Sequence, residues 1–171
     1  MKKDNIQTVD FGVWPKGEFN ADYAQSFTGN SYLATLSGGL LNVTFEPGCR
    51  NNWHIHHKAV QVLICVAGRG WYQEWGKEAV ELKPGVVIAI PAEVKHWHGA
   101  AKDSWMQHLT YHKDIQERSS NEWLEPVTDE LYNKLKPNNM SKGYALSYQS
   151  FRLSKAIISF ACLNDLVRQE Q

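Results

Sequence analysis

Hydrophobic residues fall in short runs between residues 32 and 111, and the runs are rich in Val, Ile, Trp and Tyr. Glycine and proline separate the runs, and these turn signals recur roughly every 8–12 residues, as in antiparallel sandwiches and barrels. We predict six of the runs as strands: Leu40–Phe45, Val60–Val66, Trp71–Trp75, Val86–Ile90, Val94–His98 and Trp105–Tyr111. The pattern therefore predicts an all-β domain.

The two ends of the chain have a different pattern. Residues 1–30 are polar and rich in turn residues, so we expect an arm that lies over the core. The stretch Glu122–Lys136 favours a helix with Thr128 as its N-cap, and Phe151–Gln169 carries an apolar stripe of helical period. The predicted organisation is an arm (1–30), a β-barrel (31–120) and a C-terminal helical extension (121–171).

Composition narrows the classes of function. The 171 residues include 18 Lys and Arg against 18 Asp and Glu, so the formal net charge is zero and no basic stripe indicates a nucleic-acid partner. The apolar runs are too short to span a bilayer and no apolar segment follows the N-terminal lysines, so we expect a cytoplasmic protein without a membrane partner. The three cysteines include no CxxC pair, which favours neither a disulfide framework nor a thiolate zinc site.

All seven histidines lie between His54 and His112. Because residues i and i+2 of a strand face the same side, His54 and His56 direct two imidazoles at one point, and His96 and His98 do the same. Two such pairs on neighbouring strands provide neutral nitrogen ligands for a transition metal. The histidine pattern therefore predicts a metal site inside the barrel.

The spacing around these histidines follows two motifs. The first reads G-x5-H-x-H-x4-Q-x6-G and the second reads G-x5-P-x4-H; their positions are Gly48, His54, His56, Gln61 and Gly68, then Gly85, Pro91 and His96. This pair of motifs resembles the cupin superfamily, which implies a jelly-roll barrel, also described as a double-stranded β-helix. The sequence departs from the superfamily pattern at Gln61, where Glu is usual, at Glu93, where Gly is usual, and at Ala100, where Asn is usual.

Four shorter segments resemble one group of small cupins, the hydroxynitrile-lyase-like group, whose barrels are similar to those found beside carboxymuconolactone decarboxylase domains. These segments are Val43–Gly48, Asn52–His54, Gly68–Gly70 and Lys95–Ala100, and the likeness runs from Phe11 to Lys136. It implies that His54, His56, Gln61 and His96 are metal ligands. It also implies a metal-dependent carbon–carbon lyase that cleaves or forms a cyanohydrin, a small α-hydroxy compound.

The chemistry of the four ligands agrees with this expectation. Three imidazoles and an amide are neutral, so a bound divalent ion keeps its full charge, whereas the usual Glu would cancel part of it. Four protein ligands leave one or two positions open on an octahedral ion, and among Mn, Fe, Ni and Zn we favour Mn. An alternative for Gln61 is that it orients a bound water molecule instead of the metal.

Two further histidines are candidates for proton transfer, and several alternatives stay open. His98 and His108 are either catalytic bases or residues that orient the ligands. His57 is expected in solvent and His112 in a structural role. An iron-dependent dioxygenase and a non-catalytic, metal-assisted binder of small molecules are the alternative functions. The many Trp residues and the expected edge strands favour a homodimer with the arm in its interface.

Overall fold

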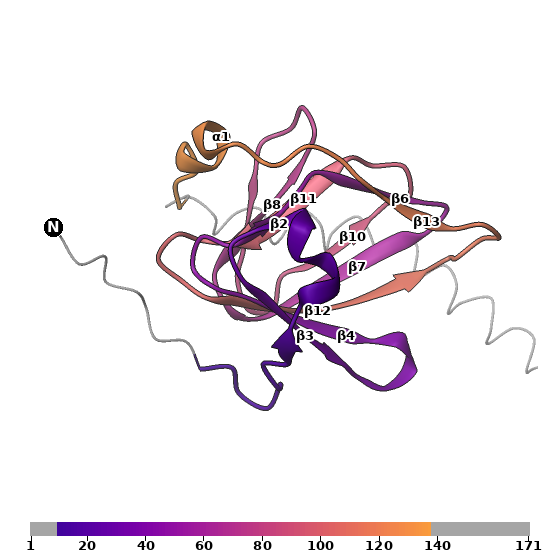
Figure 1. Ribbon diagram of the computed structural model, residues 1–171, viewed down its shortest axis with the longest axis horizontal. Helices are drawn as coiled ribbons and strands as arrows, with labels where there is room; N and C mark the ends of the chain where they lie inside the picture. Colours follow the sequence, from indigo (N-terminus) through magenta and orange to yellow (C-terminus); the bar gives the residue numbers. More distant parts are fainter. Residues whose placement is uncertain (1–9, 138–171) are drawn as a thin grey trace, which may run out of the picture. The chain divides into compact units, whose positions relative to one another are not determined.

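The computed structural model describes residues 10–137, which form two antiparallel sheets (Figure 1). The first sheet has the order β1-β3-β4-β12-β7-β10, with bounds β1 Glu18–Phe19, β3 Ser31–Thr35, β4 Leu41–Phe45, β12 Met106–Lys113, β7 Val60–Gly68 and β10 Val87–Ile90. The second has the order β13-β6-β11-β5-β2, with bounds β13 Ser120–Trp123, β6 His54–His57, β11 His96–Ala100, β5 Arg50–Asn51 and β2 Phe27–Thr28. Strand β8 (Gly70–Glu74) pairs with β11 and with β9 (Val80–Leu82). The predicted jelly-roll barrel is confirmed.

Each of the six predicted runs overlaps an observed strand, and the ends differ by a few residues. The alternation of side chains places Leu63 and Cys65 of β7 on the buried side with Gln61, as a strand requires. One main core cluster fills the barrel and includes Phe45, Leu63 and Met106. A second cluster, with Trp53, Trp71, Trp97 and Tyr132, lies under the C-terminal part of the described chain.

Two backbone oxygens in the described part of the N-terminal arm accept hydrogen bonds from side chains of the barrel. Pro15 O accepts a hydrogen bond from Asn42 Nδ2 at 2.5 Å, and Lys16 O accepts one from Thr44 Oγ1 at 3.0 Å. Both acceptors therefore attach the arm to β4. Downstream lie β1, a short 3-10 helix (Ala21–Ser26) and β2, which adds to the second sheet.

The helix predicted for Glu122–Lys136 is wrong over most of that range. Its first residues belong to β13, which pairs along β6, and the α-helix α1 spans only Asp129–Asn133. The free edge of β6 offers backbone hydrogen bonds, and Pro126 disfavours helical backbone at the residue before it, so the helix begins only after Thr128. The N-cap prediction is confirmed, because Thr128 Oγ1 accepts from Leu131 N at 3.2 Å. The helix predicted for Phe151–Gln169 lies outside the described residues.

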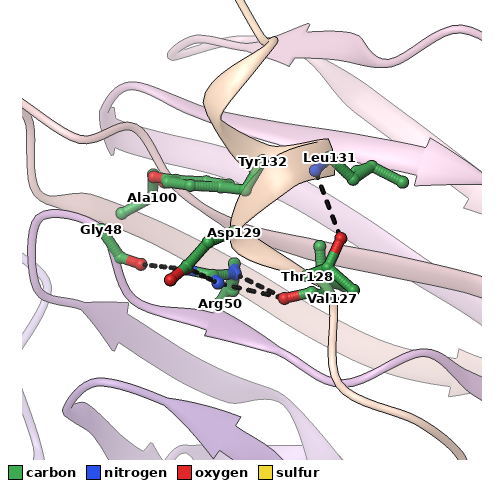
Figure 2. A network of polar contacts seen from close by, with 8 residues as sticks. All are labelled: Gly48, Arg50, Ala100, Val127, Thr128, Asp129, Leu131 and Tyr132. Carbon is green, nitrogen blue, oxygen red and sulfur yellow. Dashed lines mark hydrogen bonds and ion pairs between the residues drawn. The ribbon is translucent and has the colours of Figure 1, made fainter.

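Helix α1 is fixed to the barrel by Arg50 of β5 (Figure 2). The side chain of Arg50 is buried; its Nη2 donates to Val127 O at 3.0 Å and forms an ion pair with Asp129 at 2.5 Å. The guanidinium also lies 4.4 Å from the ring centre of Tyr132, whose hydroxyl donates to Ala100 O at 2.6 Å. A buried charge that is paired and hydrogen-bonded is tolerated, so this network anchors the chain that follows β13.

Four motif positions, Gly48, Gly68, Gly85 and Glu93, have the left-handed backbone conformation that favours glycine. Gly68 has φ +68°, and a Cβ there would lie 1.9 Å from Trp105 O, so a side chain is excluded. Glu93, which replaces the usual Gly, also has a left-handed φ of +67°. Its carboxylate accepts from Lys58 N at 3.0 Å, which ties this turn to the end of β6.

In the part of the chain that the structure describes, no helix is long and apolar enough to cross a membrane.

Candidate metal centre

Three buried histidines converge on one point of the barrel interior. His54 and His56 lie on one face of β6, and the pairing of β11 with β6 places His96 opposite His54. One ring nitrogen from each of the three lies within 4.8 Å of the others. This is the arrangement that the His-x-His spacing predicts, and it is the one group of three or more His, Cys, Asp or Glu side chains suited to a metal within residues 10–137.

The Nδ1 atom of each of these histidines faces an oxygen, which defines where the proton lies. His54 Nδ1 donates to Asn52 O at 3.0 Å, and His96 Nδ1 donates to Val94 O at 2.8 Å. His56 Nδ1 donates to Asn121 Oδ1 at 2.6 Å. A neutral imidazole carries one proton, so each Nε2 atom keeps a lone pair for a ligand bond. Within residues 10–137 no group forms a hydrogen bond with the buried Nε2 of His56, as expected of an atom that binds a metal.

Burial keeps the three imidazoles neutral. It lowers the pKa of His54 well below the usual value and the pKa of His96 to about 4, and it is also the main cause of the lowered pKa of His56. The neighbouring histidines lower the pKa of His54 further. Because a metal competes with protons for imidazole, a cluster that is neutral near pH 7 is ready to bind one.

Gln61 completes the cluster from β7. Its side chain is buried, and Oε1 lies 3.1 Å from His96 Nε2. With the His96 proton on Nδ1, two lone pairs face each other across this distance. A cation bound by both atoms would turn this repulsion into attraction. The donor set of three imidazole nitrogens and one amide oxygen therefore fits a divalent first-row ion.

His98 and His108 lie next to this cluster but have different hydrogen bonds. The backbone N–H of His98 donates to Asn51 Oδ1 at 2.9 Å, so the amide Nδ2 faces the ring. It lies 2.9 Å from Nδ1 and 3.3 Å from Nε2 of His98, and the shorter contact assigns Nδ1 as the acceptor. The proton of His98 is then on Nε2. His108 Nδ1 donates to Leu109 O at 3.3 Å, and none of the described residues forms a hydrogen bond with its buried Nε2. At Nε2, His98 can therefore donate a hydrogen bond, whereas His108 can accept one.

The two rings form a pair with a shared environment. Their ring centroids are 4.9 Å apart, and Phe45 contacts both. Burial lowers the pKa of His98 well below the usual range, and burial lowers the pKa of His108 to about 4. Both imidazoles are therefore neutral near pH 7, and the unpaired Nε2 of His108 is available as a proton acceptor.

The remaining two histidines differ from each other. His57 points away from the cluster, as expected, and pairs with Glu93 at 2.5 Å and Glu122 at 2.8 Å, whose hydrogen bonds raise its pKa. His112, expected in a structural role, has its Nε2 3.2 Å from His56 Nδ1. A fourth imidazole therefore lies beside the cluster.

Three neighbours of the histidines were not recognised from the sequence: Asn51, Asn121 and Trp123. Asn51 orients His98, Asn121 accepts from His56, and the ring of Trp123 lies 4.9 Å from that of His54. Trp123 lies in the stretch predicted to be helical, Glu122–Lys136, and Asn121 directly precedes that stretch. Asn121 and Trp123 are two residues apart, as His54 and His56 are. This matching spacing on a neighbouring strand is the signal that could have identified them.

Comparison with known proteins places these features in a family. Residues 41–110 match the cupin domain family. Over 96 residues the chain is 46% identical to a protein named (R)-mandelonitrile lyase from Granulicella tundricola, a match that covers 54% of this chain and 70% of that protein. Among solved structures, a cupin-like protein from Thermotoga maritima is 36% identical with a TM-score of 0.67, and the match covers 75% of this chain and 99% of that one. The barrel, the two motifs and these matches agree: the chain belongs to the cupin family.

Proposed function

We propose that this cupin is a metal-dependent lyase that cleaves or forms a cyanohydrin. The observation that carries the proposal is the set of three buried imidazoles whose Nδ1 atoms are all held by oxygens, so that their Nε2 atoms converge. The likeness to a protein named mandelonitrile lyase supports the choice of reaction. The ligands are His54, His56 and His96, with Gln61 as the fourth.

The metal is a single divalent ion among Mn, Fe, Ni and Zn, and we favour Mn²⁺ because four protein ligands leave one or two positions open on an octahedral ion. When bound, it would supply a positive charge that polarises the substrate oxygen and steadies the departing cyanide. The amide of Gln61 leaves that charge uncompensated, in contrast to a carboxylate at the same position.

Proton transfer is assigned to the chain's own residues. The Nε2 atom of His108 takes the hydroxyl proton of the cyanohydrin while the bond between the carbinol carbon and the cyanide breaks. The electron pair of that bond leaves with cyanide and the carbonyl forms, so the products are an aldehyde and, after the proton returns, hydrogen cyanide. His98, with its proton on Nε2, supplies a hydrogen bond next to His108. The support is the unpaired Nε2 of His108 and its neutral state.

The experiment that tests the proposal is an assay of released cyanide with Mn²⁺-loaded protein and a panel of cyanohydrins that includes mandelonitrile. We expect cyanide release above the spontaneous rate, and its loss in His54→Ala and in His96→Ala. His57→Ala is the matched control, because His57 neighbours the cluster and points away from it. Metal-loaded protein that consumes oxygen and releases no cyanide would contradict the lyase and favour the dioxygenase. Metal binding without any turnover would favour the binding protein.

We also propose that the protein is a homodimer. Val87 on the edge strand β10 and Phe19 on the edge strand β1 are exposed large hydrophobic residues, and edge strands with such side chains commonly pair with another copy. Sedimentation at micromolar concentration is expected to give the mass of two chains. The mass of one chain would contradict this part of the proposal.

A further inference from the structure

The short edge strand β13 lies directly beside two of the three converging histidines. It pairs with β6 so that Asn121 is opposite His56 and Trp123 is opposite His54. Each of these residues contacts the ring opposite it: Asn121 through its amide oxygen, and Trp123 through its indole ring. The two contacts follow from the alternation of side chains along one strand.

His56 differs from the other two histidines in how its Nδ1 is held. His54 and His96 each donate to the backbone carbonyl two residues earlier, which no substitution removes. His56 donates instead to a side chain that is distant in sequence, Asn121, at 2.6 Å. The orientation of this one imidazole therefore depends on the docking of β13.

A competing partner makes this dependence chemically important. His112 Nε2 lies 3.2 Å from the same His56 Nδ1. If His112 donated to that atom, the proton of His56 would move to Nε2, and the lone pair that faces His54 and His96 would be lost. Asn121 Oδ1 can only accept a hydrogen bond, so it selects the other tautomer.

We propose that Asn121 is a positioning residue, which holds the proton of His56 on Nδ1 so that Nε2 is free to bind the metal. The inference rests on the proposed metal site and adds that one side chain of β13 sets the tautomer of one of its ligands. Two further contacts hold β13 in place. Glu122 pairs with His57 at 2.8 Å on the outer side, and the ring of Trp123 contacts those of His54 and Phe27.

The test compares three variants of the full chain. Asn121→Leu removes the acceptor, Asn121→Asp keeps an acceptor at the same place, and Glu122→Gln weakens the outer ion pair of the same strand. Mn²⁺ alone is titrated into each apoprotein, and the free ion is followed by its EPR spectrum. We expect Asn121→Leu to bind about 10- to 100-fold more weakly, as is usual for residues that orient a ligand, and the other two to stay within about threefold of the unchanged protein.

A second readout needs no metal. NMR spectra that detect two-bond 15N–1H couplings in apoprotein with 15N-labelled histidine report which ring nitrogen carries the proton. His56 is expected to carry it on Nδ1 in the unchanged protein and in Asn121→Asp, and to show protonated Nε2 in Asn121→Leu. Equal weakening by Asn121→Leu and Glu122→Gln would overturn the positioning role and leave Asn121 with strand docking only.

The outcomes separate this inference from the proposed function. Weaker Mn²⁺ binding and an altered tautomer in Asn121→Leu, without cyanide release by the unchanged protein, would overturn the lyase and support the inference. Cyanide release with unchanged Mn²⁺ affinity and tautomer in Asn121→Leu would overturn the inference alone. An unchanged protein that binds no Mn²⁺ would overturn both.

Discussion

Two groups of histidines share the interior of this barrel and differ in what they can do. His54, His56 and His96 form one group, and His98 and His108 form the other; all five are nearly inaccessible to solvent. In both groups burial is the first cause of a lowered pKa. Burial makes all five neutral, so it cannot explain why one group resembles a ligand set and the other an acid–base pair.

The partner of Nδ1 explains the difference. In the first group every Nδ1 donates to an oxygen, so three Nε2 lone pairs are directed at one point. In the second group His98 Nδ1 accepts from Asn51, while His108 Nδ1 donates to Leu109 O. One ring then offers a proton and the other a lone pair. The hydrogen-bond partner of Nδ1 therefore decides whether Nε2 of a buried histidine carries a proton or a lone pair.

The largest expected effect concerns the first group. His54→Ala or His96→Ala should reduce the bound metal from near one ion per chain to almost none, because the weak amide of Gln61 cannot replace an imidazole. Metal content is measured by elemental analysis after purification without chelator. His57→Ala serves as the control and should keep its metal. Full metal content in the double variant His54→Ala/His96→Ala would show that the first group does not bind the metal, so the two groups would no longer differ in this respect.

The second group should show the opposite behaviour. His108→Ala should keep its metal and lose roughly 10²- to 10⁴-fold in the rate of cyanide release, which is the usual contribution of a general base. His98→Ala should also keep its metal and lose less, because His98 supplies a hydrogen bond and does not accept the proton. If both variants retain metal and full rate, neither histidine is the base.

Because the histidines of both groups are buried, the apoprotein should lose stability against unfolding as the pH falls. The pKa of His108 is about 4 when folded, against an ordinary value near 6.5 when unfolded, so the unfolded chain takes up the proton first as the pH falls. Stability is thus complete above about pH 6.5 and is lost towards pH 4. His108 alone should account for roughly 2 to 3 kcal/mol between pH 7 and pH 4.5.

Urea unfolding at the two pH values measures this effect. His108→Gln should reduce the pH dependence by that amount. His57→Gln should not reduce it, because hydrogen bonds to Glu93 and Glu122 raise the pKa of His57. An unchanged pH dependence in His108→Gln would mean that this imidazole is protonated in the folded state at the lower pH.

A smaller effect is expected from the charge of the fourth ligand. Gln61→Glu adds a negative charge next to His96, so release of metal to a chelator should slow by about tenfold while cyanide release falls. Chelator competition and the cyanide assay are run on the same preparation. Faster metal release in Gln61→Glu would show that Gln61 does not bind the metal.

The sequence predicted the parts of this protein that depend on local spacing. The strands of the barrel, the shared face of His54 and His56 and the N-cap at Thr128 are consequences of residue type and period, and the structure contains them. The group of three histidines required two strands to pair, and the motif spacing was sufficient to anticipate that pairing.

What the sequence did not show depends on contacts between distant segments. Residues 120–123 have no strong strand pattern, and they become β13 because the edge of β6 is free to pair. For the same reason Asn121 and Trp123 were not recognised as neighbours of the histidines. The tautomers of His98 and His108 depend on Asn51 and on a backbone oxygen, which no spacing rule predicts.

The Nε2 atoms of His54, His56 and His96 are expected to bind one metal ion together. Elemental analysis of the unchanged protein, purified without chelator, tests it most directly. We expect close to one first-row divalent ion per chain. A content below about one ion per ten chains, with no uptake of added Mn²⁺, Fe²⁺, Ni²⁺ or Zn²⁺, would contradict it.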